Sequence, residues 1–287
     1  MSWMNLLILV IVAVALALPG VFLVLRNMAM VADAISHTVL LGIIVGYFFV
    51  PDMQSPFLIL MAALVGLLTV CCIELLVQKG LLKSDAATGI IFPSFFALGV
   101  ILLSRYFSNI HLDLDAVIMG DITFADFNLI SIGPWFLPKS LVYGSAILVI
   151  NCLFLSIFYK ELKLSCFDIE QFLLAGFSQA LIGYSLITLL SLSAVVSFEI
   201  VGAILVVSFL VTPAASALLL ARHLHITLLL TVIYALFNSV VGYFLSIAFN
   251  VSSSGMCAFV AGVSFLITLL ATRIKKILRL KRVSQQS

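Results

Sequence analysis

Long apolar runs divide this sequence from end to end, and each is close to the length that crosses a lipid bilayer. A membrane-spanning helix needs about 20 mostly apolar residues. Runs of that kind lie near residues 5–25, 30–50, 57–77, 87–106, 140–159, 174–196, 198–220, 226–248 and 255–272. A water-soluble chain with 64% hydrophobic residues would expose much of that apolar area and aggregate. The sequence therefore predicts an all-α, polytopic transmembrane helical bundle of about eight to nine spans.

Two places leave the number of spans open. The runs on either side of Ser197 are so close together that we expect one helix to be short or tilted. The stretch from Asn109 to Lys139 is too polar for a span, but it could hold a short or re-entrant helix. No soluble stretch is long enough to bury a core of its own. We therefore expect residues 1–287 to form a single transmembrane domain.

Basic residues gather on one side of the predicted membrane. If the chain crosses at each run, that side receives Arg26, Lys79, Lys83, Lys160, Lys163, Arg222 and the C-terminal cluster TRIKKILRLKR. The other side receives only Arg105 and Lys139, together with the acidic stretch HLDLDAVIMGDITFAD. The positive-inside rule assigns the basic side to the cytoplasm. We therefore expect a multi-pass cell (plasma) membrane protein whose basic tail, about residues 273–287, is cytoplasmic. With nine spans, the N-terminus would be outside.

Small residues and a proline fall inside the later runs. Gly202 and Gly242 are expected within membrane helices, where a small residue allows close helix packing. Pro213 removes a backbone hydrogen bond and should kink its helix, with Thr212 and Ser208 available to compensate.

An acid and an imidazole stand near the start of the second run, in MVADAISHTVLLGIIVGYFFV (30–50). Asp33 and His37 are four residues apart, so a helix would stack both side chains on one face, with Cβ atoms about 6 Å apart. An unpaired charge in lipid costs several kcal/mol, so this face must meet a partner, an ion or water. A carboxylate and an imidazole can together bind one divalent cation, and they suit manganese, iron or zinc better than calcium or magnesium.

The spacing alone leaves three roles open for this pair. Asp33 and His37 could bind a cation. They could instead hydrogen-bond each other or cap a helix near the cytoplasmic interface, since Arg26 lies close before them in the sequence. They could also relay protons in a cation-coupled carrier.

Three stretches, taken in order, carry a family resemblance. VLRNMAMVADAISHTVLLGI (24–43) has an arginine after the first run, a methionine-rich turn, and D-A-x-S-H followed by leucine and glycine. SDAATGIIFPSFFALGVILL (84–103) has an acid-small-x-G-I segment that leads into A-L-G-V. VGAILVVSFLVTPAASALLLAR (201–222) has a V-G-x-x-L-V segment that ends in P-A-A-x-A. In this order and spacing the chain resembles the manganese, zinc and iron-chelate family of ABC transporter permeases over nearly its whole length.

The resemblance implies a fold, ligands and partners. It implies an ABC importer permease in which the D-A-x-S-H motif makes Asp33 and His37 metal ligands on the translocation path. It also implies a homodimer of permease chains, two cytoplasmic ATP-binding subunits and an external metal-binding lipoprotein. The metal would be cargo, so we expect no permanently bound cofactor, and we expect no nucleic-acid partner.

The sequence predicts that another chain would hydrolyse any ATP that drives transport. It contains no GxxxxGK[ST] motif to hold nucleotide phosphates, so we expect no enzymatic activity of its own. The partner ATPase would need a docking surface, and KELKLSCFDIEQFLLAG (160–176) is the candidate coupling segment, an assignment that the resemblance supports. Phe167 could insert into a groove on the ATPase, with Asp168 and Glu170 ahead of an apolar patch. An ordinary solvated loop is the alternative.

Glu199, in SFEIVGAILVV, lies near the predicted external side, where it could line an outer gate or sit among the lipid headgroups. For the cargo, one carboxylate and one imidazole per chain favour manganese, with zinc or iron as alternatives, because the pair contains no thiolate. An alternative function is a proton- or sodium-coupled secondary carrier without an ATPase. Such carriers often contain inverted repeats, and the chain shows no convincing second copy of the D-x-x-x-H segment.

Overall fold

The computed structural model describes residues 3–52, 55–106, 129–132 and 135–284. Within these ranges nine helices are long and apolar enough to cross a membrane. They are α1 (Trp3–Leu25), α2 (Ala29–Phe49), α3 (Pro56–Gln78), α4 (Ser84–Tyr106), α6 (Lys139–Ile157), α9 (Gln179–Val201), α10 (Ala203–Leu220), α11 (Leu224–Phe249) and α12 (Ser253–Ser284). The predicted all-α membrane bundle is confirmed. Helices are expected here because backbone groups in lipid must be hydrogen-bonded within the chain.

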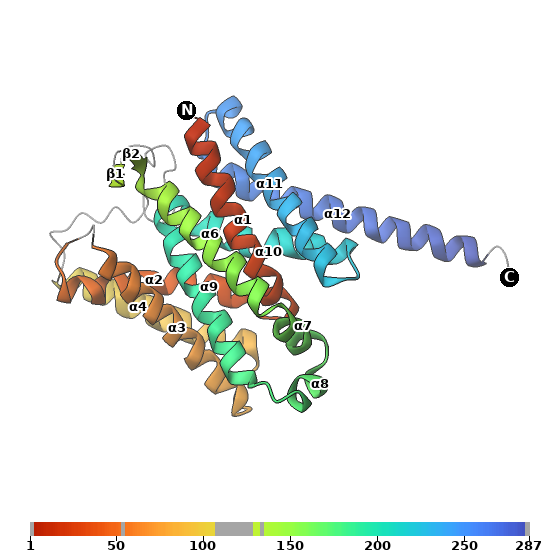
Figure 1. Cartoon of the computed structure of the whole chain (residues 1–287), viewed down its shortest axis with the longest axis horizontal. Helices are drawn as coiled ribbons and strands as arrows, with labels where there is room; N and C mark the ends of the chain where they lie inside the picture. The colour runs from red at the N-terminus through yellow and green to blue at the C-terminus, as the bar shows by residue number, and fades with distance from the viewer. Residues whose placement is uncertain (1–2, 53–54, 107–128, 133–134, 285–287) are drawn as a thin grey trace.

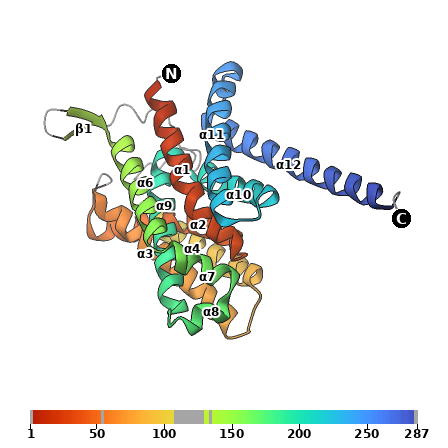
Figure 2. The same ribbon diagram turned by 45° about the vertical axis from the view of Figure 1, so that its right-hand side comes forward.

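The helices form two packed groups (Figures 1 and 2). α1 packs against α6, α9, α10 and α11, and α10 and α11 also pack against α12. α2 packs between α3 and α4, and it meets the first group through α9 and α10. The α1 sequence is apolar on all sides, which is typical of a helix surrounded by other helices. The end of α12 extends away from the rest of the bundle (Figure 1).

The chain turns between two spans at Gly202 and not at Ser197. Gly202 ends α9 and begins α10 with φ 79°, in the left-handed region that glycine adopts far more easily than other residues. The expectation that Gly202 lies inside a helix is therefore wrong. α10 has 18 residues and is the shortest of the nine candidate spans, as expected for one of this pair. Ser254 of α12 stabilises the break by donating a hydrogen bond to the Val201 carbonyl, at 2.8 Å.

A short hairpin forms the last part of the polar stretch from Asn109 to Lys139. β1 (Leu129–Ile132) and β2 (Trp135–Pro138) pair antiparallel, with Leu129 opposite Pro138. The hairpin forms because isoleucine, tryptophan and phenylalanine favour strands, and here they are bounded by a glycine and prolines. The short or re-entrant helix stays a prediction, since residues 107–128 of this stretch lie outside the described residues. The acidic residues predicted for the external side lie outside the described residues.

Two short helices follow α6. α7 (Tyr159–Phe167) and α8 (Ile169–Leu174) lie side by side at one end of the bundle (Figure 1). Arg26, just after α1, donates a hydrogen bond to the Ser165 hydroxyl at 3.0 Å and so ties α7 to the first span. α8 then leads into α9, whose first turn is capped by the Ser178 hydroxyl.

Candidate functional site

Asp33 and His37 lie side by side on α2, as their spacing predicts. Asp33 Oδ1 is 3.4 Å from His37 Nε2, and the two side chains are 36% and 37% exposed. Their neighbours Ser36 and Thr38 are buried, and each turns its hydroxyl back to a carbonyl of the same helix, at 3.0 Å. The acid and the imidazole are therefore on a different side of α2 from these buried hydroxyls and remain partly exposed.

Two aromatic rings of α4 hold the imidazole. The Phe92 ring is stacked on His37, with ring centroids 5.4 Å apart and an interplanar angle of 26°. The Phe96 ring meets His37 edge-on at 6.0 Å and 77°. Phe92 and Phe96 are also at i and i+4, so both rings lie on the face of α4 that contacts His37 of α2. Pro93 lies between them inside α4 and removes one backbone hydrogen bond there.

The described part of the chain supplies two ligands and no more at this place. Nowhere among the described residues do three or more histidine, cysteine or acidic side chains converge as a metal site would require. Selective binding of a transition metal normally uses about four ligands. The α2 face is also open, and α4 beside it is the least buried of the nine candidate spans. Asp33 and His37 alone are therefore fewer ligands than such a site normally uses.

The candidate coupling segment, 160–176, folds into α7 and α8. Phe167 is 59% exposed and Glu170 is also exposed. The Asp168 carboxylate caps α8 by accepting a hydrogen bond from the Gln171 N–H at 3.0 Å. Leu174 is 88% exposed and adds to the apolar surface, a residue that sequence reasoning did not single out. The segment is structured and exposes apolar side chains, unlike an ordinary solvated loop.

Glu199 is close to the end of α9 and is paired. Its Oε1 is 3.0 Å from the Lys139 ammonium, at the start of α6 beside the hairpin. Lys139 also stands 5.3 Å from the centre of the Tyr143 ring. Glu199 lies on α9 and is paired with Lys139, whereas Asp33 and His37 lie on α2 and are paired with each other. The structure therefore does not bring Glu199 into the same polar cluster as the other two.

A buried polar contact that sequence reasoning missed joins three helices. The Asn151 amide of α6 donates to the Ala15 carbonyl of α1 at 2.7 Å and accepts from the Ser193 hydroxyl of α9 at 3.1 Å. Asn151 is fully buried. A lone asparagine within the apolar run 140–159 is the signal that could have found it.

Comparisons with known proteins bear on the whole chain. The family model described as ABC 3 transport family matches residues 3–272. The zinc transport system membrane protein TroD of Treponema pallidum (strain Nichols) is 44% identical over 264 residues, which cover 92% of this chain and 72% of that protein. The manganese transport system membrane protein MntD of Bacillus subtilis (strain 168) is 43% identical over 257 residues, with 89% and 87% covered.

Two solved structures are similar as well. PsaBC from Streptococcus pneumoniae, solved in complex with Fab, has a chain that superposes with a TM-score of 0.78 at 29% identity, covering 97% of this chain and 94% of that one. An inward-facing conformation of a putative metal-chelate type ABC transporter gives a TM-score of 0.64 at 21% identity, covering 93% and 85%. The second likeness bears on the fold alone.

Proposed function

Because this chain belongs to the ABC 3 transport family and is the membrane permease of a metal importer, we propose that its cargo is a divalent transition metal ion. Manganese is the first choice, with zinc or iron as alternatives. The observation that carries this proposal is the Asp33–His37 pair, a carboxylate and an imidazole side by side and turned out of the core of α2. Family membership decides against the ion-coupled secondary carrier.

The metal site is shared between two copies of the chain around a two-fold axis. Two copies would bring two aspartates and two histidines together and so supply four ligands. The exposure of Asp33 and His37 supports this arrangement, because a charged side chain left facing lipid is costly. A metal-bound structure of the complex with the two α2 helices far from the axis would contradict it.

ATP is hydrolysed by a separate pair of cytoplasmic subunits, which dock on residues 160–176. Phe167 and Leu174 offer the apolar contact, and Glu170 adds charge beside them, while Asp168 keeps α8 folded. The test is Leu174→Asp, which places a charge on the docking surface without touching the core. We expect the ATP-binding subunit to be lost on co-purification. Full retention of that subunit would contradict this docking surface.

The basic side of the bundle, including the C-terminus, faces the cytoplasm, and an external metal-binding lipoprotein delivers the ion to the opposite side. This orientation follows from the positive-inside rule applied to the nine candidate spans. On the external side, Glu199 contributes to an outer gate, since its ion pair with Lys139 joins the ends of α9 and α6. Residues 1–287 act as one permease domain.

The deciding experiment measures metal accumulation, element by element, in cells that make the complete transporter. Asp33→Ala and His37→Ala are each expected to abolish uptake of one metal while the permease still assembles with its ATPase. Ser36→Ala is the matched control, because it lies between them and changes only a hydroxyl bonded back to Ala32. Normal uptake by the Asp33→Ala/His37→Ala double variant would refute the site.

A further inference from the structure

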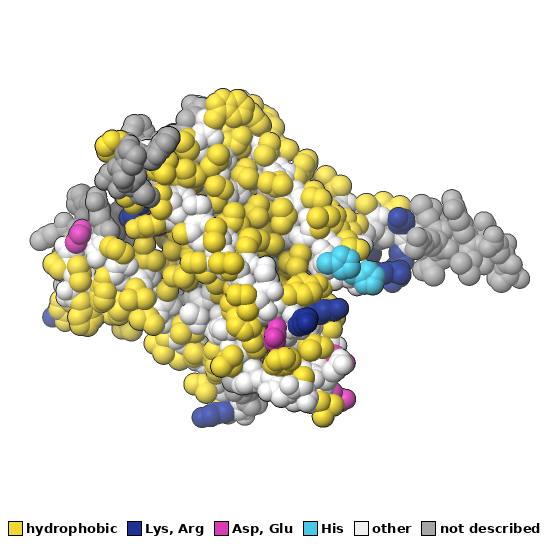
Figure 3. Space-filling view, viewed as in Figure 1, with side chains coloured by type: hydrophobic (Ala, Val, Ile, Leu, Met, Phe, Trp, Pro, Cys, Tyr) yellow, Lys and Arg dark blue, Asp and Glu magenta, His cyan; other side chains and the backbone are white. Residues whose placement is uncertain are grey.

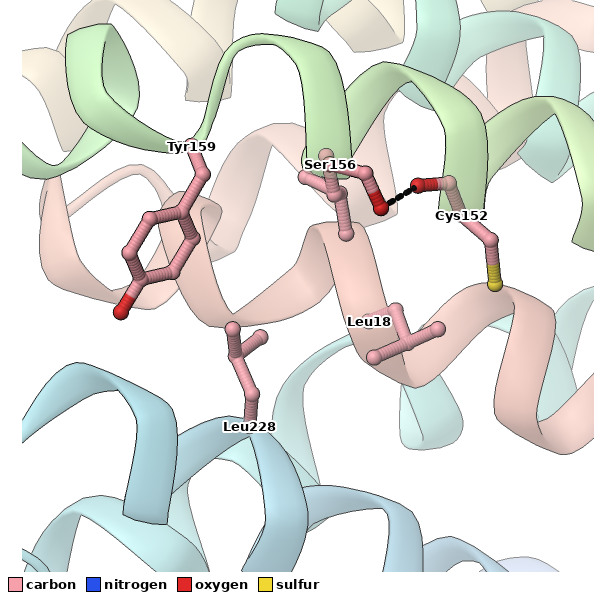
Figure 4. Close-up of a pocket in the computed structure, with 6 residues that line it drawn as sticks. Leu18, Cys152, Ser156, Tyr159 and Leu228 are labelled. Carbon is pink, nitrogen blue, oxygen red and sulfur yellow. Dashed lines mark hydrogen bonds between the residues drawn. The ribbon is translucent and has the colours of Figure 1, made fainter.

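A hollow of about 420 Å³ lies between α1, α6 and α11 (Figure 4), and neither Asp33 nor His37 lines it. It is lined by Leu18, Cys152, Leu155, Ser156, Tyr159 and Leu228. Most of the lining is apolar, and the Ser156 hydroxyl is already bonded to the Cys152 carbonyl at 2.7 Å. Its volume falls in the range of small-molecule sites, roughly 300–1,000 Å³. This groove therefore has room for an apolar ligand and offers that ligand almost no polar contact inside.

The groove lies at the basic end of the bundle. Its lining comes from the last turns of α6, the second half of α1 and the second turn of α11, and these three ends are on the same side of the predicted membrane. Tyr159 is the first residue of α7, separated from α6 by Phe158, and it extends its ring toward Leu228 (Figure 4). An aromatic ring with a polar tip is typical of the boundary between the hydrocarbon and headgroup layers.

One cationic and two imidazole side chains adjoin the lining residues in the sequence. Lys160 follows Tyr159 and is exposed, and His225 is exposed one turn before Leu228 on the same side of α11. The rings of His223 and His225 are stacked, with centroids 5.7 Å apart. Figure 3 shows lysine and arginine side chains near this histidine pair, with an acidic side chain beside them, on a face that is mostly apolar. The mouth therefore suits an anion, while the groove suits a hydrocarbon chain.

We propose that this groove binds an anionic phospholipid. One acyl chain lies along Leu18, Leu155 and Leu228, and the phosphate sits at the level of Tyr159 and Lys160. The apolar groove with a cationic mouth matches both parts of such a lipid, and a basic group near an anionic headgroup layer contributes favourable energy. The proposed orientation decides which leaflet of the membrane supplies the lipid, but the position of the groove in the bundle does not depend on it.

A second copy of the chain is a poorer occupant for this groove. The proposed two-fold contact uses the open face of α2 and α4, and neither helix contributes a lining residue. A protein partner would also leave the cationic mouth without a matching anion unless it carried one. A phospholipid is present at this depth in every membrane and supplies both parts at once.

The test uses the complete transporter, reconstituted in vesicles that contain spin-labelled phosphatidylglycerol or spin-labelled phosphatidylcholine. We expect an immobilised lipid population that prefers phosphatidylglycerol. Lys160 opens the coupling segment but lies two helical turns before Phe167 on α7, so Lys160→Gln should leave the ATP-binding subunit bound. The variant should weaken the phosphatidylglycerol association about fivefold and leave phosphatidylcholine nearly unchanged. Lys83→Gln is the matched control, because it removes the same charge from an exposed site between α3 and α4.

Filling the groove tests the apolar half separately. Ser156→Phe from the α6 wall, or Leu228→Phe from the α11 wall, should remove the immobilised population of both lipids while assembly with the ATP-binding subunit persists. The proposal is overturned if the two lipids associate equally, if Lys83→Gln weakens binding as much as Lys160→Gln, or if neither filling variant changes the immobilised fraction. Disulfide cross-linking between the Cys152 residues of two copies would also overturn it, since it would place a second chain over the groove.

Discussion

Replacing Phe92 with leucine is expected to weaken metal capture without preventing assembly. The Phe92 ring is stacked on the His37 imidazole at 5.4 Å, and leucine keeps a similar apolar bulk without the flat ring. Such aromatic pairs contribute about 0.5–1.5 kcal/mol beyond the burial of their area. If that energy holds His37 ready for the ion, its loss raises the KM for metal about two- to twelve-fold. If two copies share the site, the variant removes the stacking from both His37 side chains. The two effects on KM then multiply, and KM rises about 5- to 150-fold.

The assay is the initial rate of metal uptake into vesicles that contain the whole transporter, measured over a range of metal concentrations. Phe92→Leu should raise KM with little change in kcat. Phe92→Tyr should have the KM of the unchanged protein, because the aromatic ring is kept. Phe95→Leu is the control, since His37 stacks with Phe92 and Phe96 and not with Phe95 among the described ring contacts. An unchanged KM in Phe92→Leu, in a preparation where His37→Ala abolishes uptake, would show that the stacking does not prepare the ligand.

Three further changes test the scaffold and the outer end of the bundle. Asn151→Leu removes two interhelical hydrogen bonds, at about 0.6 to 1.7 kcal/mol each, so unfolding in detergent should become easier by roughly 1–3 kcal/mol, and Ser193→Ala in the same background should then add little. Gly242→Val should lower the thermal midpoint, because a Cβ at that position would lie 2.5 Å from the Cys257 Cα; an unchanged midpoint would argue against this helix contact. Glu199→Gln breaks a half-exposed ion pair, so stability should change by less than about 1 kcal/mol while the uptake rate falls, and a normal rate would argue against the gate.

Most of the helices could be predicted because a span leaves a long apolar run in the sequence. The predicted run 174–196 nevertheless began five residues before α9, which starts at Gln179. Its first residues are the apolar end of α8 and the turn after it, and Leu174 is 88% exposed. Hydropathy cannot distinguish an apolar residue that faces lipid from one that is exposed on a surface outside the membrane. The cap signals at Asp168 and Ser178 separate the two helices better than hydropathy does.

The candidate site was predictable only in its local part. Asp33 and His37 share a face because four residues make about one helical turn, and this follows from the sequence alone. Phe92 and Phe96 reach His37 only through the packing of α4 on α2, which no local pattern specifies. The same limit applies to Glu199, whose partner Lys139 is 60 residues away. Contacts between distant helices depend on packing, and packing is decided by the whole bundle.

The polar residues of α2 differ in how their hydrogen bonds and charges can be satisfied inside a membrane. Ser36 and Thr38 satisfy their hydroxyls on the helix's own carbonyls, so they can be buried at little cost. Neither a carboxylate nor a charged imidazole can be satisfied in that way, because each needs a counter-charge or an ion as well as hydrogen bonds. Asp33 and His37 offset part of this cost on each other, and the face that they leave open adjoins α4, the least buried span. If a second copy and a metal ion cover this face, as we propose, the energy that would be lost by leaving it against lipid is regained, so assembly and cargo binding should stabilise one another.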